Sequence, residues 1–192
     1  MGDTRSGMIE VAATMLRRAG YRAMTLVDVV DAGGLPRGSI YHHFPGGKPE
    51  LAIEALRYIN DGVSADIGAA LRRATTPAEV VAEVFIFQAR ELEASGFRDG
   101  CWFATTALEL GPDDDDLAGV LDERFHQWEA ALAATFERTG LGPDDDVGPM
   151  SAARLLIATL EGGLIRARVA RDVRLLTDLI PVVCRALPDV TD

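Results

Sequence analysis

Side chains that can donate hydrogen bonds to phosphate oxygens are grouped in one short stretch of the sequence, between residues 25 and 48. Arginine also reads base edges in the major groove of duplex DNA, so Arg37 could select a sequence as well as bind a backbone. Gly38 would let the protein backbone itself come close to a nucleic acid. The residues with this chemistry are Thr25, Arg37, Gly38, Ser39, Tyr41, His42 and Lys48.

Two short predicted helices would position these side chains. Thr25 and Asp28 have the spacing of a capping box, which predicts a helix from about residue 25 to residue 33. A glycine pair ends that helix, and a proline at its first position predicts the next helix over residues 36–43. Short helices joined by a tight turn form the helix-turn-helix layout, whose second helix can enter the major groove.

The rest of the chain also carries apolar residues at helical spacing, and its sequence lacks strand signals. We therefore expect an all-α fold of about nine helices, with a three-helix helix-turn-helix head at residues 1–47 and a helical body at residues 48–192. Gly20 should end the first helix, and Pro181 should bend the last one. The helices are expected at about residues 4–19, 25–33, 36–43, 48–74, 76–94, 101–110, 116–139, 149–170 and 172–187.

The charge of the chain is distributed unevenly. The 192 residues carry a net charge of −11, which by itself argues against binding to nucleic acid. The first 48 residues nevertheless have a net charge of +2, and the acidic excess lies in the remainder, which hints that the two parts have different partners. No apolar run is long enough for a membrane span, and the N-terminus does not resemble a signal peptide, so we expect a soluble, cytoplasmic protein.

The sequence has no constellation typical of an enzyme or a metal site. Only three histidines occur, and Cys101 and Cys184 are far from them in sequence. The acidic runs at residues 113–116 and 144–146 lack the spacing and the glutamate of a calcium loop. No nucleophile, base and orienting group stand at a familiar spacing. We therefore expect neither catalysis nor a cofactor.

The stretch from Thr25 to Leu51 resembles the DNA-binding domain of the TetR family of transcriptional regulators, and more narrowly that of its LmrA-like branch. Pro36 departs from the family pattern, because many members have serine or threonine there, and Gly33 replaces a commoner alanine. The binding mode should survive both changes. The residues that carry the resemblance are Thr25, Gly33, Gly34, Gly38, Tyr41, Phe44 and Lys48.

The resemblance implies a ligand-responsive regulator, expected to be a repressor, that binds a palindromic operator in double-stranded DNA as a homodimer and is released by a small-molecule effector. Tyr41 could instead fill the core of the head, and we expect Phe44 to do so. A helical adaptor that binds a protein through its head is the alternative, although it leaves Arg37 and Tyr41 unexplained. The expected DNA-binding residues are Thr25, Pro36, Arg37, Gly38, Ser39, Tyr41, His42 and Lys48.

The resemblance also places an effector site among the helices of the body and a dimer interface on the last two helices. Aromatic residues at helical spacing could equally fill an ordinary core. The expected effector residues are Phe85, Cys101, Trp102, Phe103, Phe125, Trp128, Leu156 and Leu160. The last two helices have apolar residues at three- and four-residue spacing, as a helix-packing seam does, which an intramolecular core face would also explain. The expected dimer residues are Leu160, Gly163, Leu164, Ala167, Val173, Leu176, Ile180 and Val183.

Overall fold

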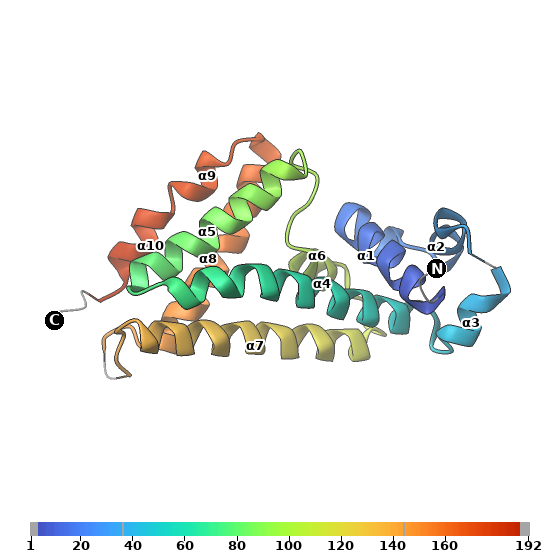
Figure 1. Ribbon diagram of the computed structural model, residues 1–192, viewed down its shortest axis with the longest axis horizontal. Coiled ribbons are helices and arrows are strands. Elements are labelled where there is room, and N and C mark those ends of the chain that lie inside the picture. Colours follow the sequence, from blue (N-terminus) through green and yellow to red (C-terminus); the bar gives the residue numbers. More distant parts are fainter. Residues whose placement is uncertain (1–3, 36, 144, 189–192) are drawn as a thin grey trace. The chain divides into compact units, whose positions relative to one another are not determined.

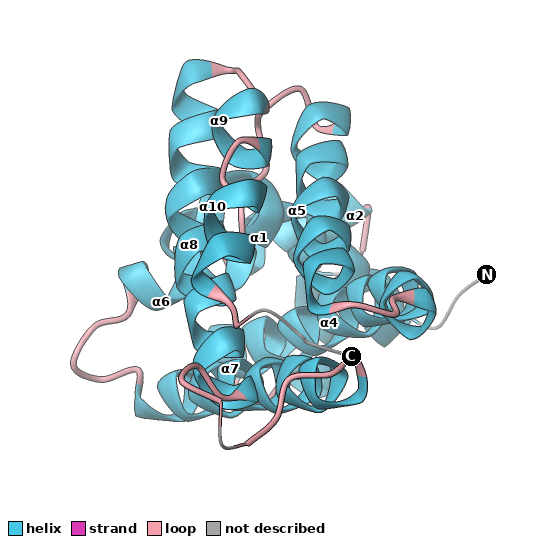
Figure 2. Cartoon of the chain, turned by 90° about the vertical axis from the view of Figure 1, so that its left-hand side faces the viewer, coloured by secondary structure: helices cyan, strands magenta, loops and turns pink. Residues whose placement is uncertain are grey.

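The structure, a computed structural model, describes residues 4–35, 37–143 and 145–188. Every regular element within these ranges is a helix, and loops and turns join the helices (Figures 1 and 2). The predicted all-α fold is therefore confirmed. By their internal contacts, the residues form two compact units, Met1–Ser64 with Cys101–Asp122, and Ala65–Gly100 with Glu123–Asp192.

The first unit contains the predicted helix-turn-helix. Its core is formed by buried apolar side chains that include Met8, Leu16, Val29, Phe44 and Phe103. Its elements are α1 (Thr4–Ala23), α2 (Leu26–Gly33), the 3-10 turn η1 (Arg37–Ser39), α3 (Ile40–His43), the first part of α4 (Gly47–Arg73), α6 (Trp102–Glu109) and the start of α7 (Asp115–Arg138).

Local sequence signals fix both ends of α2, as predicted. The Thr25 hydroxyl accepts a hydrogen bond from the Asp28 backbone N–H at 3.1 Å and donates one to the Asp28 carboxylate at 2.6 Å. This cap satisfies a backbone donor that the first turn of a helix leaves free. At the other end Gly34 adopts a φ of 59°, and its N–H bonds to the Asp31 carbonyl. Glycine takes this left-handed conformation without a steric penalty.

The second unit contains the rest of α4 and α7 together with four further helices. Thr76 caps the start of α5, since its hydroxyl accepts from the Glu79 N–H at 3.2 Å. Hydrogen bonds from the Thr75 backbone N–H and hydroxyl to the Glu79 carboxylate lower the pKa of that carboxyl group. The four helices are α5 (Pro77–Ala94), α8 (Pro149–Ala170), α9 (Arg174–Thr177) and α10 (Ile180–Ala186).

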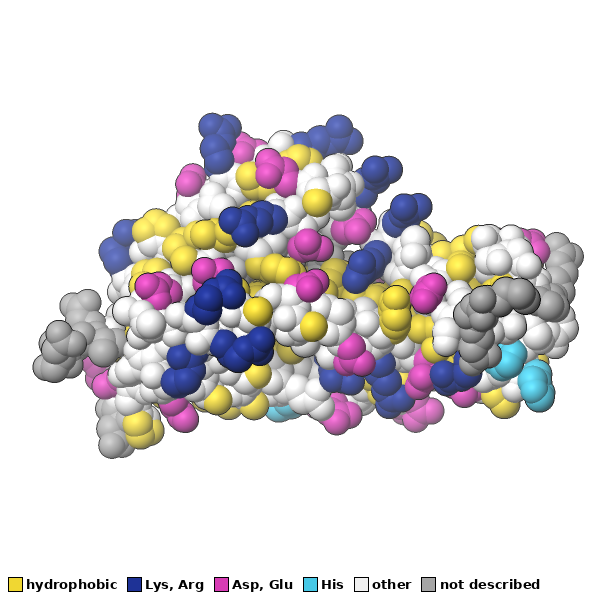
Figure 3. Space-filling model, in the orientation of Figure 1, with side chains coloured by type: hydrophobic (Ala, Val, Ile, Leu, Met, Phe, Trp, Pro, Cys, Tyr) yellow, Lys and Arg dark blue, Asp and Glu magenta, His cyan; other side chains and the backbone are white. Residues whose placement is uncertain are grey.

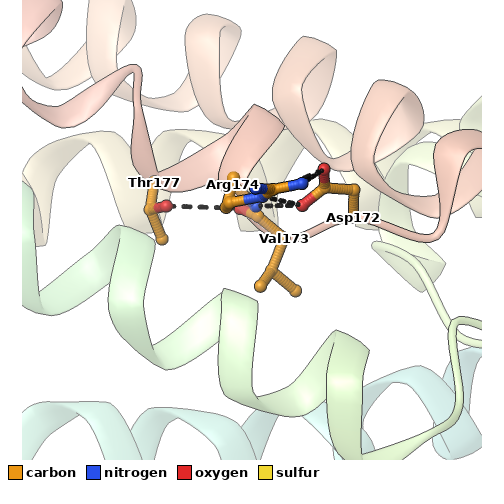
Figure 4. Close-up of polar contacts among 4 residues, drawn as sticks. All are labelled: Asp172, Val173, Arg174 and Thr177. Atoms are coloured by element: carbon orange, nitrogen blue, oxygen red, sulfur yellow. Dashed lines mark hydrogen bonds and ion pairs between the residues drawn. The ribbon is translucent and has the colours of Figure 1, made fainter.

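A tight turn between α8 and α9 reverses the chain (Figure 4). Arg171 ends α8 with a φ of 53°, and the Asp172 carboxylate then accepts hydrogen bonds from the Arg174 backbone N–H at 3.0 Å and from its guanidinium at 2.8–3.2 Å. The Arg174 side chain thereby holds the pKa of Asp172 below its usual value. The reversal allows α9 and α10 to pack against α8 and α5 (Figure 1).

The single helix expected at residues 172–187 is divided in two. Pro181 was predicted to bend it, but α9 ends at Thr177 and Pro181 lies in the first turn of α10. The reason is local, because proline has no N–H to donate to the Thr177 carbonyl one turn earlier. Proline is well tolerated in the first turn of a helix, where the N–H has no partner in any case.

Candidate nucleic-acid interface and effector region

Two polar side chains of α3 point away from the core of the head. Tyr41 is 65% exposed and His42 is also exposed, whereas Ile40 and Phe44 are buried. The buried pair fixes the rotation of this single helical turn, so the outward side chains have a defined direction. Histidine side chains lie at the surface of the head (Figure 3). His42 and His43 belong to α3, and the centres of their rings are 5.2 Å apart. Phe44 fills the core as predicted, and Tyr41 does not.

The backbone before α3 leaves room for a close approach. Gly38 and Ser39 lie in η1, and a Cβ atom built on Gly38 meets no protein atom within 4 Å. The fold of this chain therefore does not demand glycine at position 38. Pro36 and the side chain of Arg37 lie outside the described residues, so their contacts with DNA stay predictions.

Lys48 and Thr25 each have a partner inside the head. The Lys48 ammonium donates a hydrogen bond to the Arg22 carbonyl at 3.2 Å, and its nitrogen lies 4.4 Å from the centre of the Tyr21 ring. An ammonium has three donors, so one bond to the carbonyl leaves others for phosphate. Thr25, in contrast, already donates its hydroxyl proton to Asp28. No local sequence pattern indicated the structural role of Lys48.

The end of α1 is attached to α6 and to the turn that follows α6 by a set of polar contacts. Arg22 donates from its backbone N–H to the Glu109 carboxylate at 3.0 Å, and from Nε to the Glu109 carbonyl at 2.8 Å. Tyr21 donates its hydroxyl to Asp114 at 3.4 Å; burial, followed by the nearby Asp114 charge, raises the pKa of this tyrosine. The contacts join residues about 90 positions apart, so no local sequence pattern could have indicated them.

The end of α1 can approach α6 this closely because residue 20 is glycine. Gly20 has a φ of 83° and a ψ of 178°, which interrupts the helix at the predicted position. A Cβ atom there would overlap the carboxylate of Glu109, with Oε2 at 2.7 Å. Gly20 therefore serves both the break in α1 and the contact with α6.

The expected effector residues fall in both units. In the first unit, Trp102 and Phe103 are buried, and the Cys101 sulfur accepts from the Ala104 N–H at the start of α6. In the second unit the Phe125 and Trp128 rings meet edge to face, with centres 5.6 Å apart, and both are partly exposed. The remaining three, Phe85, Leu156 and Leu160, are buried within the second unit. Contact of any of these residues with an effector stays a prediction.

Most of the expected dimer residues pack within the single chain. A Cβ atom on Gly163 would lie 2.6 Å from Leu176 Cδ1 and 2.8 Å from Leu179 Cδ1, which places the crossing of α8 and α9 at this glycine. Val173 and Ile180 are partly exposed. The others are buried: Leu160, Leu164, Ala167, Leu176 and Val183. The apolar seam of α8 therefore packs against helices of the same chain, and an intramolecular core face accounts for its periodicity.

The opposite side of α8 carries a second apolar stripe, and this stripe is exposed. Ile165 is 56% and Val169 is 75% exposed, while Gly162 has no protein atom within 4 Å of a built Cβ. These residues follow Ala158 at four- and three-residue spacing and therefore share one face of the helix. Leu175 and Val182 are exposed in the same way on α9 and α10. We call these six residues the outer stripe.

The described ranges contain neither a metal-binding cluster nor a membrane-spanning helix. These ranges contain no group of three or more histidine, cysteine, aspartate or glutamate residues placed to hold a metal ion. None of the helices within them combines the length and the apolar character that a membrane crossing requires.

Profiles of known protein families match both the helix-turn-helix segment and the body of the chain. A family profile described as the C-terminal domain of LmrA/YxaF-like transcriptional regulators matches residues 77–180, and the profile of bacterial regulatory proteins of the tetR family matches residues 8–55. The HTH-type transcriptional regulator Rv0196 of Mycobacterium tuberculosis is 34% identical over 177 residues, which cover 90% of this chain and 88% of that protein. LmrA of Bacillus subtilis is 27% identical over 89% of both chains.

Solved structures have the same fold. A cysteine mutant of the TetR-family regulator CifR, in complex with 26-bp double-strand operator DNA, superposes with a TM-score of 0.83 at 20% identity and covers 95% of this chain and 96% of that chain. The family profiles and the Mycobacterium relative extend the resemblance seen around Thr25–Leu51 to most of the sequence. The chain therefore belongs to the TetR family of bacterial transcriptional regulators, in its LmrA/YxaF-like branch.

Proposed function

We propose that this regulator is a repressor that binds a palindromic operator in double-stranded DNA as a homodimer and leaves it when a small-molecule effector binds to the body. In this proposal residues 1–47 contact DNA together with Lys48, and the body, residues 48–192, binds the effector and the second subunit. The observation that carries it is the outward direction of Tyr41 and His42 on a helix anchored by Ile40 and Phe44. Such a helix presents its donors to the major groove and to flanking phosphates.

The proposed contacts divide by the chemistry of the side chains. Arg37, in the first turn of the recognition segment, would read base edges, whereas Ser39, Tyr41, His42 and Lys48 would bind phosphates. Gly38 would bring its backbone N–H close to the duplex. The net positive charge of the first 48 residues favours this end of an otherwise acidic chain for contact with a polyanion.

We propose that the second subunit covers the outer stripe. A palindromic operator needs two heads related by a twofold axis, and a twofold interface uses the same patch on both subunits. The outer stripe has small residues at Ala158 and Gly162, which permit close approach of two helices, and larger apolar groups at Ile165 and Val169. Exposed apolar groups in such a row mark an interaction surface.

The effector would act by favouring a conformation of the dimer that does not fit the operator. A ligand shifts an equilibrium only by its difference in affinity between the two states. The effector must therefore bind more weakly to the DNA-bound form, and by linkage operator DNA must weaken effector binding by the same factor.

The proposal is tested by gel shift of the purified protein with the DNA upstream of its own gene. We expect a specific complex that survives an excess of unrelated duplex and weakens steeply as salt rises. A helical adaptor, the alternative use of this head, would leave every duplex unshifted. Absence of any shift at low ionic strength would contradict the proposal.

Gly38→Ala should weaken operator binding at least tenfold without destabilising the fold. The added methyl group meets no protein atom within 4 Å, so it should obstruct only a molecule that approaches from outside. Fluorescence anisotropy gives the dissociation constant, and urea unfolding gives the stability. Gly119→Ala, at an equally open position in α7, serves as the control and should bind like the wild type. An unchanged dissociation constant for Gly38→Ala would refute the close backbone approach.

Arg37→Ala and Tyr41→Phe should impair binding in different ways. Loss of a base contact should reduce discrimination against a mutated operator by about 1–3 kcal/mol. Loss of the Tyr41 hydroxyl, a phosphate contact, should weaken binding to all sequences by a similar factor. Binding to the operator and to a set of single-base variants at one salt concentration separates the two. Equal loss for all sequences with Arg37→Ala would remove this residue from base recognition.

A further inference from the structure

Three buried polar atoms without a hydrogen-bond partner belong to the two helices that meet at the base of the head. They are Arg17 Nε on α1, and Trp102 Nε1 and Thr106 Oγ1 on α6. Among the described residues no other buried side-chain nitrogen or oxygen lacks a partner. Because almost all buried polar groups in folded proteins are hydrogen-bonded, a group of three such atoms in one place needs an explanation.

The three side chains belong to one packed interface. Helices α1 and α6 pack against each other, and the Arg17 guanidinium carbon lies 4.8 Å from the centre of the Trp102 ring. Trp102 and Thr106 are four residues apart on α6, and such residues are neighbours on one helical face. Trp102 is 8% exposed and Thr106 is fully buried. All three lie in the first unit, so the cluster is complete within it.

The chemistry of the cluster selects the kind of molecule that would complete it. An arginine guanidinium and an indole N–H can only donate, and a hydroxyl can donate as well. Arg17 has no ion-pair or hydrogen-bond partner in the described part of the chain, and its guanidinium lies over the Trp102 ring. Glu109, the carboxylate of α6, is engaged with the Arg22 N–H. The cluster thus offers three possible donors and one positive charge, and no carboxylate of the described residues accompanies them.

We propose that the α1–α6 junction binds the carboxylate of a small organic molecule, which accepts hydrogen bonds from Arg17, Trp102 and Thr106. The planar guanidinium matches the two oxygen atoms of a carboxylate, and charge-assisted bonds are stronger than neutral ones. The apolar part of the molecule would lie against the indole. Arg17 lies in residues 8–55, which the tetR-family profile matches, so the ligand would contact the part of the chain that is proposed to bind DNA. The proposed carboxylate site does not depend on whether the protein binds DNA.

The test uses titration calorimetry of the full chain with a panel of acetate, hexanoate, benzoate and phenylacetate, with inorganic phosphate as a second arm. We expect saturable binding of at least one carboxylate, and at least tenfold weaker binding in Arg17→Met and in Thr106→Val. Phosphate should bind more weakly than that carboxylate. Arg18→Met, at the exposed neighbouring position, is the matched control and should bind like the wild type.

Two further results decide the proposal without DNA. Thr106→Val should leave the free protein as stable as the wild type in urea, because the hydroxyl that it removes has no partner. A large loss of stability would mean that the hydroxyl is already satisfied in the free protein, which overturns the site. Absence of binding by every carboxylate, equal binding by Arg17→Met, or tighter binding of phosphate would overturn it as well. Failure of operator binding would leave all these results unchanged.

Discussion

Gly162→Arg should convert the proposed dimer to a monomer and lower the affinity of the protein for the operator by about a hundredfold or more. Gly162 lies within the outer stripe of α8, and a Cβ atom built there meets no protein atom within 4 Å. The arginine should therefore leave the subunit folded. In a twofold interface the substitution occurs twice, and it places two charges on an apolar surface. Loss of the paired head removes the gain of about 10²–10⁴ that linked binding sites provide.

Sedimentation equilibrium and gel shift measure the two effects of Gly162→Arg separately. Gly119→Arg is the matched control, because Gly119 is also an exposed helical glycine with open space around its Cβ position. This variant should remain dimeric. A dimeric Gly162→Arg protein, with wild-type affinity for DNA, would show that the subunits meet through another surface.

Gly20→Ala should destabilise the protein by about 3 kcal/mol. Its φ of 83° and ψ of 178° lie in a region that is nearly restricted to glycine and costs other residues about 1–3 kcal/mol. The added methyl group would also push Glu109 away and weaken its hydrogen bond with Arg22. The free energy of unfolding from urea titration gives the cost, and the circular dichroism spectrum of the variant should remain helical.

Gly34→Ala is the comparison for Gly20→Ala. Gly34 also has a positive φ, but it lies in the ordinary left-handed region, with no protein atom near its Cβ position. Its substitution should cost about 1 kcal/mol, the price of that conformation for alanine. If both variants lost the same stability, the contact between α1 and α6 would not contribute to folding.

Local signals in the sequence predicted most of the helices and their ends. Thr25 with Asp28 caps the helix that it was expected to cap, and Gly20 interrupts α1 where a break was expected. Thr76 with Glu79 caps α5 through the same three-residue spacing. These features depend on residues within one or two turns of each other, so a single sequence contains the required information. The division between α9 and α10 also follows from a local cause, the missing N–H of Pro181, although the sequence alone predicted only a bend.

Contacts between distant segments could not be predicted in this way. The bonds between Arg22 and Glu109, and the position of Lys48 against Tyr21, depend on how α1, α4 and α6 pack. The burial of the unpartnered atoms of Arg17, Trp102 and Thr106 likewise depends on the packing of α1 against α6, so the sequence alone could not indicate it.

The spacing of apolar residues also could not show which helix packs against an apolar face. The residues around Gly163 and Leu176 had the spacing of a packing seam, and the seam is occupied by helices of the same chain. A period of 3.5 residues identifies a face that is packed against another helix, whether that helix belongs to the same chain or to a second one. The outer stripe was missed because its residues are small or separated by charges, although Ala158, Ile165 and Val169 stand at helical spacing.

We propose that two copies of this chain each insert α3 and the preceding turn into one duplex. Hydroxyl-radical footprinting of the DNA upstream of the gene tests this claim most directly. We predict two protected segments related by a palindrome, with centres about 34–36 Å or a multiple of this distance apart. A single protected segment, or uniform cleavage at low ionic strength with saturating protein, would contradict the claim.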